Sequence, residues 1–472
     1  MFGRTASPQV EGQREGGHRM HNAAAAAHQV SKCAFLSRRW LVAGLLGAVS
    51  VAAGAELHVG PGRPWEDLAP ALAAAMAGDV VVVHPRPRNE PYRMVALRVR
   101  QPGVVLRGAA GAGLYIPLSG EGADLSGRGE HPRAVVQFDP GADGCVLEGF
   151  ELWGARNADG NAAGVRVSGA RGVVIRDCVI RDNDMGVMSD GGGLPDGARG
   201  LRLESCEIRD NGSDAHAGYA HNLYLAGEEA VVLGCRIARA RTGHNLKSRA
   251  HRTRVWGSLL IGAAERELDL VDAAGWTDRP GSDVWVAGCV IVKAQVTRGN
   301  RGVVHFGRDG PADRMGQLWM LYNTVITPHA APVVTISCPK ASVWMEGNLF
   351  AGGGAASGRR LLVEVPGGPA EGRVTGCDNW VDAGYGAVLP AGLRATRVGE
   401  PGRSLPWRGP VEADYRLRAP VPGITDAGAM CGELESRLGG LRLTEFVPPW
   451  GWRPRPCRGR LDLGAFEWSG ER

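Results

Sequence analysis

The sequence has few aromatic residues and few stretches able to form long helices. Aromatic residues make up 6% of the 472 positions, whereas glycine occurs 71 times and proline 29 times. Glycine destabilises a helix interior by about 1 kcal/mol relative to alanine, and proline by about 3 kcal/mol. A helix-rich fold is therefore excluded, although hydrophobic residues at 44% of positions are enough for a packed core.

The sequence also lacks a concentrated excess of one charge. Its 54 basic and 49 acidic residues give a net charge of +5, and the basic residues form no stripe. A nucleic-acid partner is not expected, because such proteins carry clustered positive charge. The mild basic excess is compatible with an anionic polymer as partner.

Long apolar runs are absent except near the beginning, at residues 40–55. This run is shorter than the roughly 20 residues of a membrane span and typical of a signal-peptide core. The small residues Ala53, Gly54 and Ala55 predict cleavage before Glu56, with Met20 as an alternative start. We therefore expect residues 1–55 to direct export to the periplasm or beyond, with no membrane anchor.

Two arginines, Arg38 and Arg39, stand immediately before this apolar run. A paired arginine before a modest apolar core is typical of the twin-arginine export signal. The alternative is the basic segment of an ordinary secretory signal.

Residues 56–113 predict an N-terminal cap and the first strands. Residues 65–77 carry apolar side chains at Trp65, Leu68, Leu72 and Met76, the spacing of one helix face. Gly78 and Asp79 end this helix, and the four valines that follow predict a buried strand.

A repeat dominates residues 114–399. Each unit has a short apolar segment, one small polar residue and a second apolar segment, as in 173–180 and 201–208. The small residue recurs every 23 to 34 positions, at Cys178, Cys206, Cys235, Ser258, Cys289, Asn323 and Asn348. A motif with this period predicts a solenoid, and short strands without intervening helices indicate an all-β parallel β-helix.

The cysteines at these repeat positions are expected to be small buried hydrophobic residues. A zinc site is not expected, because no two cysteines have the Cys-x-x-Cys spacing. Coils about 4.8 Å apart would also allow disulfides between neighbouring cysteines. The repeat fades after Gly384, and residues 400–472 predict a proline-rich tail packed on the last coils. Cys431 and Cys457 of this tail are the better candidates for a disulfide after export.

A third strand in each coil brings polar residues together. When these strands are aligned, Leu223, Leu246, Leu268 and Val304 alternate inward. The same alternation predicts one outward line of titratable residues, Tyr224, Lys247, Asp269 and His305. Asn222, Asn245 and Glu267 are predicted to form a second outward line, two residues earlier. Long turns at 190–199, 272–282 and 307–317 are expected to wall a groove over this face.

A histidine stands immediately before each of the two similar strands that begin at Asn222 and Asn245. His221 and His244 have inward parity in this register, which predicts stacked core histidines. A shift of register by one residue would place them in the groove instead. Arg249 and Arg252 add positive charge close to Lys247.

The chain from residue 56 onwards resembles the pectate-lyase-like superfamily of secreted right-handed parallel β-helices. The Gly60-Pro61-Gly62 opening, the amphipathic helix and the asparagine positions carry this resemblance. Asn245-Leu246-Lys247-Ser248 followed by Arg252 is similar to the pattern of alginate- and chondroitin-cleaving lyases. Residues 268–272 depart from that pattern, because they contain no arginine. The resemblance implies a single-stranded right-handed β-helix with an N-terminal helical cap.

The resemblance also implies a reaction, namely β-elimination in a uronate-containing polysaccharide. Lys247 would be the base, and Tyr224 or His305 would protonate the leaving oxygen. The uronate carboxylate would be neutralised by Arg249, or by Ca²⁺ held by Glu267, Asp269 and Asn222. The polymer would be bound by Asn222, Asn245, His221, His244 and Arg252. We expect a monomer with an acidic polysaccharide as its partner.

Two other functions fit the same residues. A glycoside hydrolase or epimerase would draw an acid and a base from Glu267, Asp269 and Asp272. A non-catalytic glycan-binding or envelope protein would use the same face for binding alone.

Overall fold

The computed structural model describes residues 54–109, 111, 114–190, 199–352, 360–456 and 458–470. The predicted signal region 1–55 lies almost wholly outside the described residues, as do most of the predicted 190–199 turn and Cys457. In this described part, no helix is long and apolar enough to cross a membrane.

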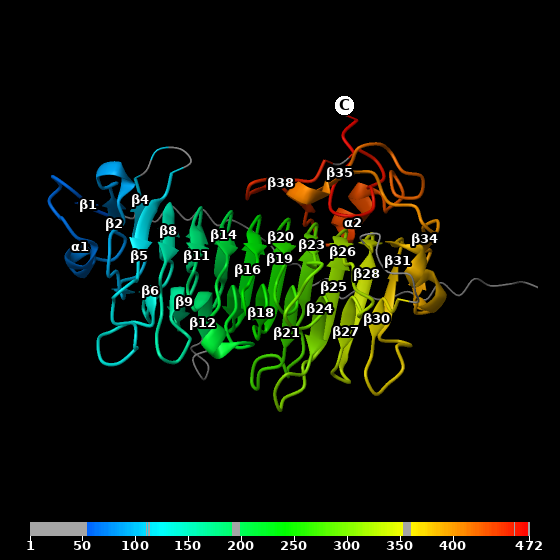
Figure 1. Cartoon of the computed structure of the whole chain (residues 1–472), viewed down its shortest axis with the longest axis horizontal. Coiled ribbons are helices and arrows are strands. Elements are labelled where there is room, and N and C mark those ends of the chain that lie inside the picture. Colours follow the sequence, from blue (N-terminus) through cyan, green and yellow to red (C-terminus); the bar gives the residue numbers. More distant parts are fainter. Residues whose placement is uncertain are drawn as a thin grey trace, which may run out of the picture. The chain divides into compact units, whose positions relative to one another are not determined.

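The repeat region coils through three long parallel sheets, which we name A, B and C (Figure 1). Sheet A contains β1 (Glu56–Val59), β2 (Val80–Val83), β4 (Val105–Gly108), β7 (Val146–Glu148), β10 (Val174–Arg176), β13 (Leu201–Glu204), β16 (Glu229–Leu233), β19 (Arg252–Trp256), β22 (Val284–Ala287), β25 (Gly316–Leu321), β28 (Ala341–Glu346), β31 (Val374–Cys377) and β33 (Leu393–Arg394). Sheet B contains β5 (Ile116–Ser119), β8 (Phe150–Trp153), β11 (Val179–Arg181), β14 (Glu207–Arg209), β17 (Arg236–Ala238), β20 (Leu259–Ile261), β23 (Val290–Val292), β26 (Thr324–Ile326), β29 (Leu349–Ala351), β32 (Trp380–Val381) and β34 (Arg397–Val398). Sheet C contains β3 (Leu97–Val99), β6 (Ala134–Phe138), β9 (Ala163–Ser168), β12 (Met185–Asp190), β15 (Leu223–Leu225), β18 (Leu246–Ser248), β21 (Leu268–Val271), β24 (Val304–Gly307), β27 (Val334–Ile336) and β30 (Val363–Glu364).

Each coil adds one strand to every sheet in turn. For example, β13 in sheet A leads to β14 in sheet B, then to β15 in sheet C and back to β16 in sheet A. The pairing between successive coils is parallel throughout these three sheets. The chain is therefore a right-handed parallel β-helix, which confirms the predicted fold.

The N-terminal helix is shorter than the sequence predicts. The α-helix α1 covers Leu68–Ala74, and its buried residues Leu68, Ala71 and Leu72 face the first strands. Backbone dihedrals become extended at Ala75, which ends the helix before Met76, and Met76 is exposed. Short 3₁₀ helices occur at Pro87–Asn89, Asp214–His216, Ala383–Val388 and Pro410–Glu412.

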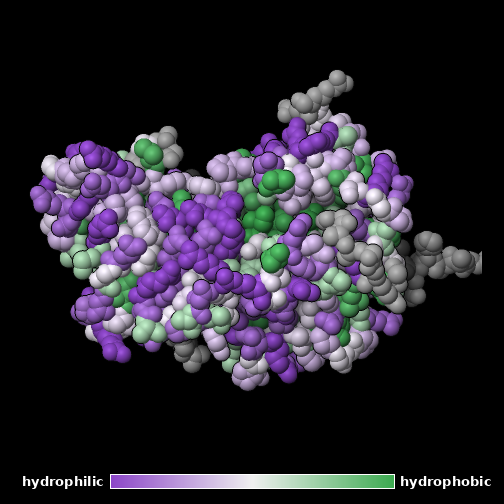
Figure 2. Space-filling model, in the orientation of Figure 1, coloured by the Kyte–Doolittle hydropathy of each residue, from purple (hydrophilic) through white to green (hydrophobic). Residues whose placement is uncertain are grey.

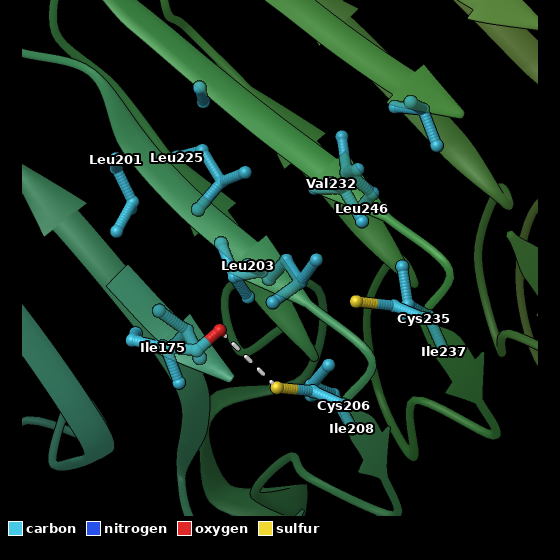
Figure 3. Close-up of a cluster of buried hydrophobic side chains, with 14 of the residues drawn as sticks. Ile175, Leu201, Leu203, Cys206, Ile208, Leu225, Val232, Cys235, Ile237 and Leu246 are labelled. Carbon is cyan, nitrogen blue, oxygen red and sulfur yellow. Dashed lines mark hydrogen bonds between the residues drawn. The ribbon is translucent and has the colours of Figure 1, made fainter. Parts of the chain in front are cut away.

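Inward side chains of the three sheets fill one continuous core. Figure 3 shows part of it, where Leu203, Leu225 and Val232 surround the repeat cysteines. Cys206 is buried and its thiol donates to the carbonyl oxygen of Ile175, with sulfur and oxygen 3.5 Å apart. Cys178, Cys206, Cys235 and Cys289 are all free and buried, as expected for small hydrophobic residues.

Asparagines take over the same corner in the later coils. The amide nitrogen of Asn323 donates to the side-chain oxygen of Asn348 at 2.9 Å, and Asn348 donates to Asn379 at 3.0 Å. All three residues are buried. Each amide also bonds the turn backbone, so the ladder satisfies polar groups that stacking would otherwise leave without partners.

Residues 400–470 pack along the outside of sheets A and B. This tail contains β35 (Trp407–Gly409), β36 (Asp414–Leu417), α2 (Cys431–Arg437), β37 (Thr444–Phe446) and β38 (Trp452–Pro454), and it is drawn orange to red in Figure 1. Its apolar residues cover outward side chains of β20, β23, β26 and β29. The Trp452 indole also donates to Glu204, so the tail reaches as far back as β13. Cys431 is disulfide-bonded, and its predicted partner Cys457 lies outside the described residues.

Candidate functional site

The outward line predicted on sheet C is present in the expected register. Tyr224 pairs with Lys247, Lys247 with Asp269, Asp269 with His305, and His305 with Thr335. The intervening residues Leu268 and Leu270 point to the core. Five consecutive coils therefore present different polar groups on one face.

Lys247 lies between two carboxylates. Its ammonium nitrogen is 3.2 Å from Asp269 Oδ2 and 2.7 Å from Asp309 Oδ2. Only 8% of Lys247 is exposed. The family resemblance implies that Lys247 is the base, but its nearest charged partners are carboxylates. An ammonium group in this position is placed to neutralise an incoming carboxylate.

Arg249 connects Lys247 to Tyr224. Its Nε donates to the Tyr224 hydroxyl at 3.0 Å, and its Nη2 reaches Asp309 Oδ2 at 2.5 Å. A third bond runs from Nη1 to the carbonyl oxygen of Asp272. One carboxylate, that of Asp309, is thus shared by Lys247 and Arg249 next to a phenol.

Asp309 belongs to the loop that follows β24 and folds back across β21 to β18. The carboxylate of Asp272 fixes this loop, because it accepts backbone N–H bonds from Asp309, Gly310 and Ala312 at 2.5 to 3.0 Å. Asp272 is buried, whereas the Asp309 side chain is 40% exposed. The loop therefore covers the titratable line instead of standing beside it as the wall of an open groove.

Asp269 is the most buried member of the line, at 2% exposed. Burial opposes its ionisation, but the hydrogen bond from His305 and the positive charges nearby hold the pKa of its carboxyl well below the usual range. Its Oδ1 is 2.8 Å from His305 Nδ1. The other imidazole nitrogen, His305 Nε2, is 2.7 Å from the hydroxyl of Ser337.

His221 and His244 are buried, and they lie on the outer side of sheet C. Their rings stack with centroids 5.1 Å apart, and His221 also packs against Tyr224. His244 Nε2 is 3.3 Å from Asp269 Oδ2, and its Nδ1 accepts the backbone N–H of Arg266. Burial lowers the pKa of His244 to about 4, so the imidazole is neutral at pH 7. The two histidines stack as predicted, but their predicted inward orientation is wrong. The strand register does not shift; both side chains face outward because the chain turns a corner just before Leu223 and Leu246.

The predicted outward orientation of Asn222, Asn245 and Glu267 is also wrong. All three are fully buried on the inner side of the corner before sheet C. Asn222 donates to Asn245 at 2.8 Å, and Asn245 donates to Glu267 at 2.5 Å. Alternation fails here because the chain turns between Asn222 and Leu223, so two consecutive side chains point inward. These residues continue a second ladder from Asn183 and Asn211 and cannot contact a polymer.

Glu267 ends this second ladder beside Lys293. Its carboxylate accepts the backbone N–H of Ala263 and lies 3.8 Å from the Lys293 nitrogen. Burial raises the pKa of Glu267 to about 7, although the positive charge of Lys293 acts in the opposite direction. Because Glu267 points inward and Asp269 outward, the structure does not assemble the predicted calcium ligands. In the described ranges, no group of three or more histidine, cysteine, aspartate or glutamate residues is placed to hold a metal ion.

Two further predicted sets are separated by the fold. Arg252 lies in β19 of sheet A, where it pairs with Glu228, and it takes no part in the cluster on sheet C. The carboxylates proposed for a hydrolase are divided as well. Glu267 is inside the coil, Asp269 faces cations, and Asp272 accepts backbone N–H groups from the loop.

A large cavity lies elsewhere, between sheet B and the tail. It has a volume of about 1960 Å³, and its lining includes Ile261, Val292, Ile326, Arg360 and Tyr415. Figure 2 shows hydrophobic residues gathered in a hollow below the tail. No sequence pattern predicts this cavity, because it depends on how the non-repetitive tail folds back.

Sequence reasoning also missed Asp309 and Ser337. Asp309 lies in the 307–317 turn, which was predicted to flank this face, but a turn without periodicity does not indicate that its side chain pairs with Lys247. Ser337 follows β27 and has the outward parity of Thr335, so extending the alignment by two residues would have found it.

No protein-family model and no curated protein sequence matches the chain. Among solved structures, it is similar to pectate lyase Pel9A, with 12% identity over 84% of this chain and 90% of that chain, at a TM-score of 0.36. A pectin methylesterase gives 10% identity over 77% and 98%, at a TM-score of 0.32. The alginate lyase AlyGC of family PL6 gives 10% over 73% and 53%, at 0.35. Similarities this low carry no information on activity.

Proposed function

We propose that the chain is an exported enzyme that cleaves an acidic polysaccharide by β-elimination at the sheet C face. The observation that carries this proposal is the shared carboxylate of Asp309. It is held by Lys247 at 2.7 Å and by Arg249 at 2.5 Å, beside the Tyr224 hydroxyl. Asp309 occupies the position that a uronate carboxylate would take when the polymer displaces it.

β-Elimination makes two demands that this arrangement meets. The proton on C5 of a uronate is weakly acidic, so the adjacent carboxylate has to be neutralised before the proton can leave. Lys247 and Arg249 supply two cations for this purpose, and charge-assisted hydrogen bonds of this kind are strong in a partly buried site. The Tyr224 hydroxyl is then the group that transfers the C5 proton.

The role of base passes from Lys247 to Tyr224 in this proposal. Arg249 donates to the Tyr224 oxygen, and this contact stabilises the phenolate that takes the C5 proton. The same hydroxyl returns a proton to the departing glycosidic oxygen. His305 is left out of this step, because its two nitrogens already contact Asp269 and Ser337.

The test is formation of an unsaturated uronate, followed by ultraviolet absorbance on a panel of uronate polymers. Tyr224→Phe removes the hydroxyl and is expected to lower the rate by roughly 10²- to 10⁴-fold. Lys247→Met is expected to lower it by roughly 10²-fold, because one cation facing the carboxylate is lost. Arg254→Met is the matched control, since Arg254 pairs with Glu229 on sheet A and should leave the rate unchanged.

The products separate the competing functions. If no polymer yields an unsaturated product, β-elimination is wrong for this chain. Release of reducing ends without absorbance would indicate a hydrolase. Retained polymer binding without any product would indicate a non-catalytic glycan-binding protein.

A further inference from the structure

The contacts of His305 form a chain that β-elimination does not use. Asp269 Oδ1 is 2.8 Å from His305 Nδ1, and His305 Nε2 is 2.7 Å from Ser337 Oγ. The three residues come from three successive coils, in β21, in β24 and immediately after β27. A hydroxyl next to an imidazole that is oriented by a buried carboxylate is the arrangement of a serine nucleophile with its base.

The proton positions follow from the partners. An ionised carboxylate only accepts hydrogen bonds, so His305 carries its proton on Nδ1, toward Asp269. The neutral ring then has a lone pair on Nε2, which accepts the hydroxyl proton of Ser337. The backbone N–H of Arg308 donates to Ser337 Oγ at 2.7 Å, so this oxygen receives one bond and gives one. Each partner therefore favours the tautomer that makes His305 a base toward Ser337.

The local backbone leaves room for this contact. Gly307 lies beside Ser337, and a Cβ at that position would be 2.1 Å from Ser337 Oγ. Any side chain at position 307 would therefore displace the hydroxyl from His305. Ser337 is half-buried, whereas Asp269 is almost fully buried, so the nucleophile is at the accessible end of the chain of contacts.

We propose that Ser337, His305 and Asp269 form a second catalytic site, which cleaves carboxylic esters of polar alcohols such as sugar hydroxyls. Ser337 and His305 are the catalytic residues, and Asp269 is a positioning residue. Arg308, whose backbone N–H contacts Ser337 Oγ, has an exposed guanidinium paired with Asp313, and this polar surrounding suits a hydrophilic alcohol. The site goes beyond β-elimination and does not rest on it.

The reaction balances without a cofactor. Ser337 Oγ bonds to the acyl carbon while its proton passes to His305 Nε2, and the carbonyl electrons move to the oxygen. The tetrahedral intermediate then expels the alcohol as the ester C–O bond breaks, and His305 returns the proton to that alkoxide. Water attacks the acyl-serine by the same route, giving a carboxylic acid and free Ser337.

A fluorophosphonate is a direct probe, because it bonds covalently to an activated serine and releases fluoride. We expect the folded protein to gain one label on the peptide that contains Ser337, detected by mass spectrometry, and to hydrolyse p-nitrophenyl acetate above background. Ser337→Ala and His305→Ala are expected to lose both signals. Ser342→Ala is the matched control, because Ser342 lies on the outer face of sheet A in β28.

Asp269 has its own readout. Asp269→Asn removes the negative charge beside His305, so the acidic limb of the pH profile of labelling is expected to move to lower pH. Asp269 also contacts Lys247, His244 and Arg266, so its replacement can disturb more than His305. Circular dichroism melting establishes that each variant is folded. A merely structural role for Asp269 would not move the pH profile.

Two results would overturn the site: absence of label on Ser337 in the folded protein, or labelling that persists in Ser337→Ala. Labelling needs no polysaccharide, so this result is independent of β-elimination. Conversely, absence of an unsaturated uronate leaves the ester-cleaving site untouched.

Discussion

At the scale of single residues, the sheet C face combines groups that are already satisfied by one another. Asp309 pairs with Lys247 and Arg249, and Asp269 is shared by Lys247, His244 and His305. Any ligand that binds here has to compete with an internal partner. The competition is strongest for anions, because Asp309 is the exposed member and the cations are held in place.

Asp309→Asn is therefore expected to strengthen the binding of acidic polysaccharide, by roughly three- to tenfold. The amide keeps the loop in place, since the backbone N–H of Asp309 still bonds Asp272. Arg249 loses its internal carboxylate and Lys247 keeps only that of Asp269, so both cations become more available to the ligand. Affinity measured at low and high salt checks this outcome, and weaker binding by the variant would contradict it.

His244 predicts a pH dependence of stability. Its pKa falls from 6.5 to about 4 on folding because of burial. Between those two pH values the unfolded chain binds more protons at His244 than the folded chain. The contribution of neutral His244 to the free energy of unfolding is therefore fully present above pH 6.5 and is lost as the pH falls toward 4. The full shift corresponds to about 3 kcal/mol at most.

His244→Asn should flatten this part of the stability curve, because an amide does not titrate in this pH range. The amide oxygen can still accept the Arg266 N–H, so the local structure is kept. Urea unfolding at several pH values between 7 and about 4 measures the slope. His131→Asn serves as control, since the His131 side chain is 56% exposed. An unchanged slope in His244→Asn would rule out this source of acid sensitivity.

At the scale of strands and corners, the sequence was sufficient wherever side chains repeat with a fixed period. The buried positions 178, 206, 235, 258, 289, 323 and 348 follow from the small residue between two apolar segments, and all are at the same corner. The line from Tyr224 to His305 follows from strict alternation within strands. Asn222, Asn245 and Glu267 were misplaced because alternation was extended through a corner, where consecutive residues can share one side.

Loops were beyond prediction for a different reason. The loop that carries Asp309 is fixed by three backbone N–H groups on the Asp272 carboxylate, and backbone donors leave no pattern in a sequence. The candidate site was therefore predictable in its strand residues Tyr224, Lys247, Asp269 and His305, and unpredictable in its covering loop.

The asparagine corner makes a prediction about stability. Asn348→Ala removes a donor to Met320 and to Asn379, and an acceptor for Asn323, all in the buried corner. Each unsatisfied buried group costs about 1–3 kcal/mol, so a loss of roughly 3–5 kcal/mol is expected in urea unfolding. Ser342→Ala, on the outer face of the same coil, should stay within about 0.5 kcal/mol. Equal losses in the two variants would refute a stabilising role for the ladder.

At the scale of the whole β-helix, the tail replaces solvent on two of the three sheets. Its side chains bury outward residues of sheet B and contact the stacked tryptophans of sheet A, where Trp285 and Trp319 lie with centroids 4.8 Å apart. Sheet C is the one that carries the titratable line. The tail thus leaves the predicted functional face separate from the surface it covers.

Tyr322 connects the tail to the coils. Its hydroxyl accepts the backbone N–H of Ala429 at 2.8 Å, and the residue is fully buried. Tyr322→Phe leaves that N–H unsatisfied and is expected to cost about 1–3 kcal/mol. Hydrogen exchange should rise in residues 425–465, while β12 to β18 should keep their protection. Uniform exchange across the chain would mean that tail and coils open together.

From the coil that contains Tyr224 to the next coil, the spacing along the sequence is the same in all three sheets. Leu223 pairs with Leu246, Glu229 with Arg252 and Arg236 with Leu259, a difference of 23 positions in each of the three sheets. Excising residues 222–244 would therefore bring Asn245 onto Asn211 and Leu246 opposite Val187, with both corners intact. Duplication of such a coil would lengthen the β-helix by about 4.8 Å along its axis, and deletion would shorten it by the same amount. Extra strands of the sheet C face can thus arise in evolution without any redesign of the core.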